Sequence, residues 1–297
     1  MTTATPLGAL SVFGTTFQNP ILLAAGTAGF GRELARVVDL DRLGGLITKA
    51  VSPEPRSGNA APRVAEFWGG MLNAIGLANP GLDHVANVEL PWLAAHLRQA
   101  RVLVNVAGSA VEDYVTVIRR LASVAVVTGF ELNVSCPNTE KGGEEFGANP
   151  TVLADLVRRC RSSTEKPLIV KLAPTLADVA STAAGAVDAG ADGFSLVNTF
   201  PGTLYRISRS DRNQFEPRLG YGRGGVSGPA LLPVGVLATR LVRERTGKPV
   251  IGMGGIRTFD DVEQYLLAGA SLVAVGTAAL ADPRVPERLV LAWGRRG

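Results

Sequence analysis

The stretch Phe130-Glu131-Leu132-Asn133-Val134-Ser135-Cys136-Pro137-Asn138 joins a largely apolar run to a polar segment that holds a cysteine between asparagines. The run predicts a strand buried on both faces, and the proline after Cys136 places that cysteine on the loop at the end of the strand. With two cysteines in 297 residues, a disulfide framework is implausible. Cys136 is therefore either an inert packed thiol or a reactive group in a polar loop.

Seven further apolar runs, rich in Val, Ile and Leu, recur between longer helical patterns, which is typical of parallel strands covered by helices. The eight predicted strands span residues 21–25, 45–50, 102–106, 130–134, 168–172, 193–198, 250–253 and 272–275. Eight strands with eight crossovers predict an α/β fold, a (β/α)8 TIM barrel, as a single domain over residues 1–297. A doubly wound open sheet is the alternative.

Helical patterns follow the strands in turn, several with Pro or Asp near the first turn. Those with the clearest pattern span residues 111–121, 151–160, 176–189, 229–246 and 260–268. The connections after strands 2 and 6, residues 51–80 and 199–228, are too long for simple crossovers and are predicted to be long irregular loops. With the Cys136 loop after strand 4, they should cover the C-terminal face, where barrel active sites are built.

The composition is that of a folded globular protein, with 46% hydrophobic and 19% charged residues. The net charge of +4 comes from scattered basic residues without interleaved aromatics, so we expect no nucleic-acid partner. Residues 1–17 show no signal-peptide pattern and residues 268–281 are too short for a span, so we expect a cytoplasmic protein without membrane contact. His84 and His96 lie away from any cysteine or carboxylate cluster, so no metal site is predicted.

Polar residues and glycines end most of the predicted strands, which is where a barrel carries its active site. They are Ala25-Gly26-Thr27, Lys49-Ala50, Asn105, Asn133 with Cys136 and Asn138, Lys171, Asn198-Thr199, Gly254-Gly255 and Gly276-Thr277. Buried lysines and asparagines are costly without partners. Either several separate internal networks satisfy these groups, or one bound polar, partly anionic ligand does. We favour the ligand because it accounts for all of them together.

Glycines near the ends of the last two strands predict a phosphate site, because small residues let backbone N–H groups approach a ligand. Gly224-Gly225-Val226-Ser227-Gly228-Pro229 similarly predicts a close backbone approach before a helix that Pro229 opens. The segment Gly220-Tyr221-Gly222-Arg223-Gly224-Gly225 has dinucleotide-fingerprint spacing, but it follows a charged loop instead of a strand, so we reject that interpretation.

A phosphate end, two lysines, several asparagines and a thiol together suggest a flavin mononucleotide (FMN) enzyme that oxidises a carbon–carbon bond. Such a reaction needs a base to accept a proton from one carbon and a hydride acceptor for its neighbour, roles that a cysteine and a flavin can fill.

The chain resembles the class 1 dihydroorotate dehydrogenases from Asn19-Pro20 to Thr277, and in particular their 1B branch. The resemblance rests on the strand-end residues above and on Ile47-Thr48-Lys49-Ala50, Glu54-Pro55-Arg56, Asn73-Ala74-Ile75-Gly76-Leu77, Asn79-Pro80-Gly81, Asn105-Val106-Ala107-Gly108, Asn133-Val134-Ser135-Cys136-Pro137-Asn138 and Lys171-Leu172. The branch is indicated by two segments that resemble 1B enzymes more closely than 1A enzymes, Lys141-Gly142-Gly143 and Phe146-Gly147.

The resemblance implies oxidation of (S)-dihydroorotate to orotate in de novo pyrimidine biosynthesis. Cys136 would be the base for the C5 proton and the flavin would take hydride from C6, with Lys49 beside both. Substrate contacts would come from Lys49, Asn73, Ala74, Ile75, Gly76, Leu77, Asn133, Asn138, Asn198 and Thr199. FMN contacts would come from Ala25, Thr27, Lys49, Ala50, Asn105, Asn133, Lys171, Val197, Gly228, Gly254, Gly255, Gly276 and Thr277.

The resemblance also implies a homodimer inside a heterotetramer, with FAD and an iron–sulfur cluster on a partner subunit that links turnover to NAD. The chain departs from the family pattern at residues 198–207, at the charged segment 208–223 and at Phe67-Trp68-Gly69-Gly70. These departures are either neutral loop drift or the mark of a different dihydropyrimidine or modified orotate as substrate. A non-catalytic phosphate-binding barrel subunit is the remaining alternative.

Overall fold

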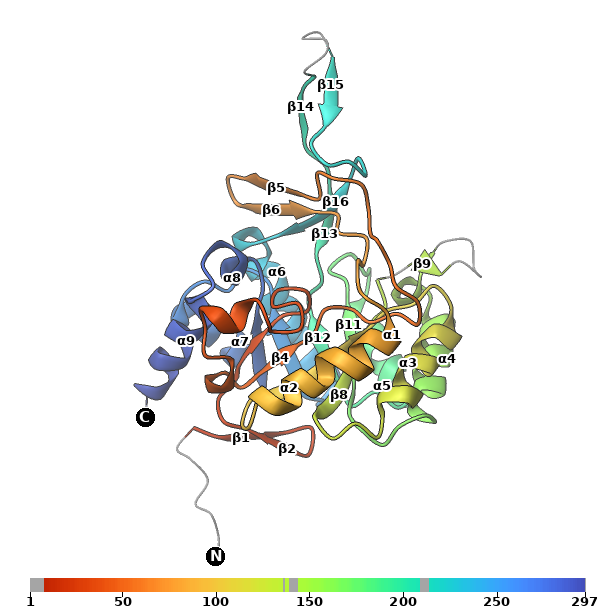
Figure 1. Cartoon of the computed structure of the whole chain (residues 1–297), viewed down its shortest axis with the longest axis vertical. Helices are drawn as coiled ribbons and strands as arrows, with labels where there is room; N and C mark the ends of the chain where they lie inside the picture. Colours follow the sequence, from red (N-terminus) through yellow and green to blue (C-terminus); the bar gives the residue numbers. More distant parts are fainter. Residues whose placement is uncertain (1–7, 136, 139–143, 209–213, 297) are drawn as a thin grey trace, which may run out of the picture.

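Eight parallel strands close into a barrel in the order in which they occur along the chain (Figure 1). The computed structural model describes residues 8–135, 137–138, 144–208 and 214–296. The barrel strands are β3 (Ile21–Leu23), β4 (Gly45–Ile47), β7 (Arg101–Val106), β8 (Val127–Asn133), β11 (Leu168–Leu172), β12 (Gly193–Leu196), β17 (Val250–Met253) and β18 (Leu272–Val275). All eight predicted strands and the barrel are confirmed, and pairing of β18 with β3 excludes the open sheet.

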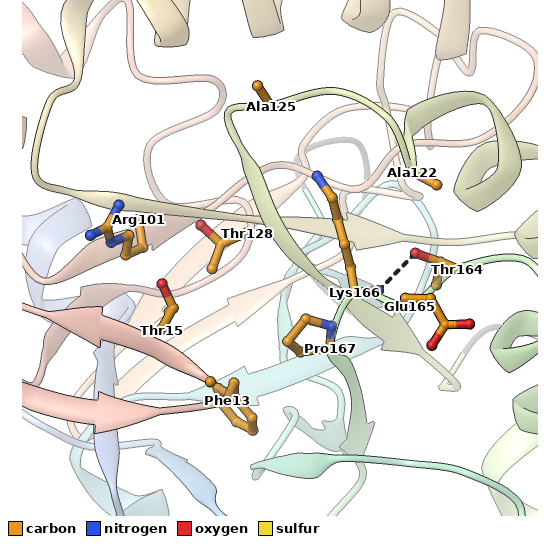
Figure 2. A pocket seen from close by; sticks show the side chains of 11 residues that line it. Phe13, Thr15, Arg101, Ala122, Ala125, Thr128, Thr164, Glu165, Lys166 and Pro167 are labelled. Atoms are coloured by element: carbon orange, nitrogen blue, oxygen red, sulfur yellow. Dashed lines mark hydrogen bonds between the residues drawn. The ribbon is translucent and has the colours of Figure 1, made fainter.

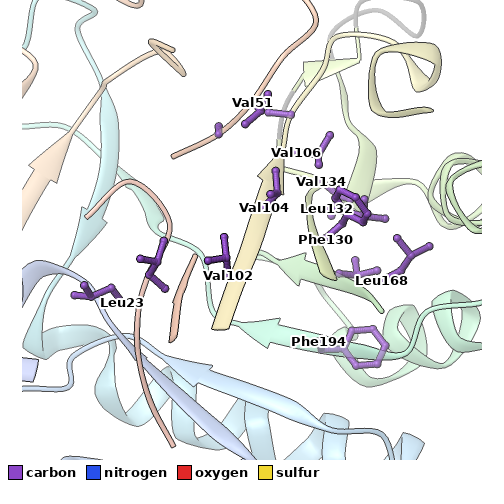
Figure 3. Close-up of a cluster of buried hydrophobic side chains, with 14 of the residues drawn as sticks. Leu23, Val51, Val102, Val104, Val106, Phe130, Leu132, Val134, Leu168 and Phe194 are labelled. Carbon is purple, nitrogen blue, oxygen red and sulfur yellow. The ribbon is translucent and has the colours of Figure 1, made fainter. Parts of the chain in front are cut away.

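Alternation along each strand separates an outer apolar layer from the barrel interior, because successive side chains of a strand point to opposite faces. Val102, Val104 and Val106 of β7 pack with Phe130 and others in the layer between strands and helices, which Figure 3 shows. Leu103 belongs to a second cluster, together with Leu22, Ile47, Ile169, Ile251 and Leu272 of the other strands. This second cluster fills the barrel interior toward the N-terminal ends of the strands.

Helices cover the outside of the barrel. They are α1 (Leu82–His84), the π-helical turn η3 (Val85–Glu89), α2 (Leu90–His96), α3 (Val111–Leu121), α4 (Pro150–Arg161), α5 (Val179–Asp188), η6 (Pro229–Leu231), α6 (Leu232–Thr246), α7 (Phe259–Leu267), α8 (Thr277–Ala281) and α9 (Val285–Gly294). The five predicted helices are confirmed within a few residues at each end. The first crossover differs from the expectation, because only the 3-10 turns η1 (Leu34–Arg36) and η2 (Leu40–Arg42) lie between β3 and β4.

The hairpin of β1 (Leu10–Val12) and β2 (Thr15–Phe17) lies at the N-terminal end of the barrel (Figure 1). Val12 and Phe17 are buried against the interior cluster that contains Leu103 and Ile169. The barrel interior is therefore closed at this end by apolar side chains.

The two long connections form a second sheet above the C-terminal end of the barrel (Figure 1). This upper sheet has the order β13-β16-β6-β5, from β5 (Val64–Phe67), β6 (Gly70–Asn73), β13 (Phe200–Gly202) and β16 (Gly224–Ser227). The expectation of irregular loops was wrong here, because the segments after strands 2 and 6 satisfy each other's backbone groups by pairing β6 with β16. Their predicted position over the C-terminal face is confirmed.

Two smaller hairpins accompany the upper sheet. β14 (Tyr205–Ile207) and β15 (Phe215–Pro217) pair into an arm that projects away from the barrel (Figure 1). β9 (Pro137–Asn138) pairs with β10 (Glu144–Glu145) in the connection after β8, and the 3-10 turn η5 (Phe146–Ala148) follows.

Candidate active site

Four polar side chains on adjacent strands form a network inside the barrel. Asn105 of β7, Glu131 of β8, Lys171 of β11 and Ser195 of β12 are all at least nine-tenths buried. Glu131 Oε1 accepts a hydrogen bond from Asn105 Nδ2 at 2.6 Å and lies 3.6 Å from Lys171 Nζ, and Glu131 Oε2 accepts from Ser195 Oγ at 2.6 Å. Lys171 therefore has a protein counter-charge, which the sequence interpretation had assigned entirely to a bound ligand.

Glu131 is a residue that the sequence interpretation missed. Its signal was present, since it is an acidic residue between the apolar Phe130 and Leu132 and shares its strand face with Asn133. A carboxylate within an apolar run is rarely buried unless it is paired.

A second chain of contacts joins three predicted substrate residues to the upper sheet. Asn198 Nδ2 lies 3.4 Å from Asn133 Oδ1, and the Thr199 N–H donates to Asn198 Oδ1 at 2.9 Å. The Thr199 side chain fills the space beside Gly225, where an added Cβ would lie 2.0 Å from Thr199 Oγ1. Asn73 Nδ2 donates to the Gly225 carbonyl at 3.2 Å, so β6, β8, β12 and β16 converge at one place.

The predicted substrate loop, Ala74-Ile75-Gly76-Leu77, is held in an unusual backbone conformation. Gly76 and Leu77 have φ values of 70° and 56°, and positive φ is uncommon for a leucine. Buried Asn79 donates to the Leu77 carbonyl and to Ser52 Oγ, both at 2.8 Å. The loop is therefore fixed from below by Asn79, and strained backbone of this kind clusters at functional sites.

Residues at the end of β3 lie near the end of β18. A Cβ added at Gly276 would be in ordinary contact with Ala24 Cβ and Thr27 Oγ1, at 3.7 and 3.9 Å, so among the described residues no atom lies closer than 3.7 Å to that position. Ala25 and Thr27 are half-buried and Ala50 is buried. Lys49 is also half-buried, and within residues 8–135 and the other described segments its ammonium has no ion pair or hydrogen bond.

The glycines predicted to meet a phosphate gather at one corner of the barrel mouth. Gly254 and Gly255 follow β17 with φ of 114° and 79°, and Gly228 has φ of 110°. Thr277 Oγ1 donates to Ser227 Oγ at 2.8 Å, which joins the end of β18 to the segment that contains Gly228. Tyr265 Oη donates to the carbonyls of Met253 and Gly254, at 2.8 Å each, and so anchors Gly254.

Cys136 lies outside the described residues, and the side chain of Asn138 does as well, so the predicted base and one predicted substrate contact are not placed. The other cysteine, Cys160, is fully buried on α4, and burial raises the pKa of its thiol to about 12. Cys160 is therefore an inert core thiol. Val197 is buried and follows β12, next to Asn198.

A groove of about 550 Å³ lies at the opposite, N-terminal end of the barrel, and Figure 2 shows the residues that line it. Phe13, Arg101 and Lys166 line it. Its two cations are already used, because Lys166 Nζ donates to the Val124 carbonyl at 2.6 Å and Arg101 Nε donates to the Thr16 carbonyl at 2.8 Å. This groove at the N-terminal face is structural.

The two histidines form local contacts on α1 and α2. His84 lies 3.0 Å from Glu89, and His96 stacks on Trp92. Among the described residues, no group of three metal-ligating side chains is found, and no helix has the length and apolarity to cross a membrane.

A phosphorylated, planar polar cofactor fits the barrel mouth. Asn105 Oδ1 is buried without a hydrogen-bond partner in the described chain, and Lys171 has no hydrogen-bond acceptor within 3.5 Å there. A corner lined by glycines lies beside these groups. A closed parallel barrel with polar side chains at its C-terminal end and glycines after its last two strands is the construction of a barrel enzyme with a phosphate-bearing ligand.

Comparison with known proteins identifies the family. The family model described as dihydroorotate dehydrogenase matches residues 8–291. The chain is 47% identical over 277 residues to the dihydroorotate dehydrogenase B (NAD(+)) catalytic subunit of Bacillus cereus strain G9842, which covers 93% of this chain and 87% of the relative. The protein of the same description from Bacillus thuringiensis strain Al Hakam gives the same values.

The chain belongs to the dihydroorotate dehydrogenase family. The resemblance inferred from the sequence is confirmed, including its branch, since both relatives are NAD-linked B-type catalytic subunits. The family implies a flavin cofactor, and the words "catalytic subunit" in the relatives' names imply that those proteins work with a second subunit.

Proposed function

We propose that this chain is the catalytic subunit of an NAD-linked dihydroorotate dehydrogenase, which oxidises (S)-dihydroorotate to orotate in de novo pyrimidine biosynthesis. One observation carries the proposal. Asn133, Asn198 and Thr199 at the barrel mouth meet Asn73 and Gly225 of the upper sheet. Amide side chains supply the donors and acceptors that a ring with two carbonyls, two N–H groups and a carboxylate requires. Family membership supports the same reaction.

FMN is the cofactor that the site suits best. Gly254, Gly255, Gly276, Thr277 and Gly228 would surround its phosphate, because their backbone N–H groups can approach an anion closely. Ala25, Thr27, Ala50 and Val197 would line the ring, and Asn105, Asn133, Lys49 and Lys171 would contact its polar atoms. When bound, FMN supplies the acceptor for the hydride that leaves C6 of the substrate.

The protein's own residues bind the substrate and accept its proton. Cys136 would accept the proton from C5 as its thiolate. Lys49, whose ammonium has no partner among the described residues, would offset the negative charge of substrate and cofactor. Asn138 and the Ala74-Ile75-Gly76-Leu77 backbone would complete the substrate contacts. The upper sheet would exclude water from the reacting atoms.

The partners proposed from the sequence have support on the surface. Trp68 is 99% exposed at the turn between β5 and β6, and Tyr205, Ile207 and Phe215 of the arm are 60%, 58% and 72% exposed. Exposed apolar groups of this size mark interaction surfaces. They support a homodimer that binds an electron-transfer subunit carrying FAD and an iron–sulfur cluster. Two cysteines and no disulfide framework support a cytoplasmic location.

Anaerobic reduction of the purified FMN-loaded protein tests the reaction. Dihydroorotate should bleach the flavin absorbance. Cys136→Ser should retain FMN, but its flavin should be reduced at least about 10²-fold more slowly, because a hydroxyl is a poor base at neutral pH. Cys160→Ala is the matched control and should react at the wild-type rate. Wild-type protein that binds FMN yet is not bleached by dihydroorotate would contradict the assignment.

The same measurement separates the alternatives. A related dehydrogenase would be bleached by another dihydropyrimidine and not by dihydroorotate, and a non-catalytic phosphate-binding subunit would not be bleached by any of them.

A further inference from the structure

The buried carboxylate of Glu131 has no place in the roles assigned above, yet it contacts two of the proposed cofactor residues. Both of its oxygens are taken up by the protein, Oε1 by Asn105 Nδ2 and the Lys171 ammonium, and Oε2 by Ser195 Oγ. Its exposed fraction is zero. Glu131 therefore acts on a bound molecule only through Asn105 and Lys171.

The contact with Glu131 determines which atom of Asn105 remains available. Because Nδ2 donates to Glu131, the carbonyl oxygen Oδ1 is the free atom, and it is buried without a partner among the described residues. An amide can present either its donor or its acceptor to a ligand. Glu131 selects the acceptor.

Glu131 also affects the positive charge that Lys171 presents to a ligand. Lys171 Nζ lies 3.6 Å from Glu131 Oε1, a distance that gives electrostatic attraction without a hydrogen bond. The hydrogens of the Lys171 ammonium are therefore left for a ligand, but the Glu131 carboxylate already neutralises part of its positive charge. A buried ion pair adds little to stability by itself, so its presence calls for another explanation.

We propose that Glu131 is a positioning residue, which holds Lys171 and Asn105 toward the flavin and sets its reduction potential by partly neutralising the Lys171 charge. The inference rests on the proposed function, since it needs a flavin at the barrel mouth. A positive charge near the flavin stabilises the anionic reduced form, and the Glu131 carboxylate opposes that effect. Removing the negative charge should therefore favour the reduced flavin.

A double-mutant cycle on the flavin-free protein tests the coupling between the two charges. Lys171→Met leaves a buried unpaired carboxylate and should be strongly destabilised, whereas Lys171→Met with Glu131→Gln should regain at least half of the loss in denaturation midpoint. Glu131→Gln can keep its bonds to Asn105 and Ser195, because the serine hydroxyl accepts as well as donates. Additive effects of the two substitutions would overturn the coupling.

The reduction potential of the FMN-loaded protein tests the effect on the cofactor. Glu131→Gln should raise the two-electron midpoint potential by about 30 mV or more, which corresponds to about tenfold tighter relative binding of reduced flavin. Ser195→Ala is the matched control, since it removes a hydrogen bond to the same carboxylate and keeps both charges, and it should shift the potential by less than half as much.

An unchanged or lower potential in Glu131→Gln would overturn the inference and leave the proposed function intact. Wild-type protein that cannot be loaded with FMN would overturn the proposed function and the effect on potential together. If Glu131→Gln does not fold, the potential is measured in the double variant and compared with that of Lys171→Met alone. The double variant should have the higher potential, and an equal or lower value would overturn the inference.

Discussion

Tyr265→Phe should destabilise the corner that holds Gly254. Tyr265 is fully buried, and its hydroxyl is shared between the carbonyls of Met253 and Gly254 at 2.8 Å each. The Met253 carbonyl keeps a second donor, the Val197 N–H at 2.9 Å, so the substitution leaves one carbonyl without a described partner. An unsatisfied buried group costs about 1–3 kcal/mol, which is the expected loss in free energy of unfolding.

Urea titration of the flavin-free protein measures this loss. Burial raises the pKa of Tyr265 far above its ordinary value, so the hydroxyl is a neutral donor throughout and the loss should be equal at pH 6 and pH 9. Tyr221→Phe is the matched control, because Tyr221 is exposed, and it should change the free energy by less than about 0.5 kcal/mol. A Tyr265→Phe loss no larger than that of the control would refute the role of the hydroxyl as an anchor.

Three further predictions follow from buried contacts and one helix cap. Gly252→Ala should cost about 1–3 kcal/mol of unfolding free energy by urea titration, because its Cβ would lie 2.3 Å from the Tyr265 ring; a neutral result would mean that the ring can move. Cys160 should resist a thiol reagent in native protein, since burial raises its pKa to about 12, and peptide mapping that finds it labelled as fast as in urea would contradict this. Asp178→Ala should lower the melting temperature at pH 7, because Asp178 caps α5 through Ser181 N–H. The bond to Ser181 holds the pKa of Asp178 below its ordinary value, so this difference should be full at neutral pH, shrink as pH falls below that ordinary value and vanish as pH falls through the depressed pKa. A difference that stays constant through this acid range would contradict a contribution of the carboxylate charge to the cap.

The barrel could be predicted because its signal is local. Each strand is a short continuous apolar run, and burial on both faces requires such a run whatever the neighbouring strands are. The strand-end positions followed from the same reasoning, since the C-terminal ends of parallel strands meet at one face of a barrel. This reasoning alone predicts Asn105, Lys171 and Asn198 as residues of the barrel mouth.

The upper sheet could not be predicted, because β6 and β16 lie about 150 residues apart and contain glycines in place of the usual strand formers. Their pairing depends on where the barrel places the two segments. For the same reason the sequence suggested a ligand as partner of Lys171, whereas the fold supplies Glu131 from the neighbouring strand.

Local pattern and motif identity are enough to predict the eight-stranded barrel, the family and the residues at the barrel mouth. Which of these residues touch one another depends on the fold. The distance between Glu131 and Lys171, the free oxygen of Asn105 and the contact of Asn73 with Gly225 all depend on strand register, which places side chains from distant segments within a few ångströms of each other.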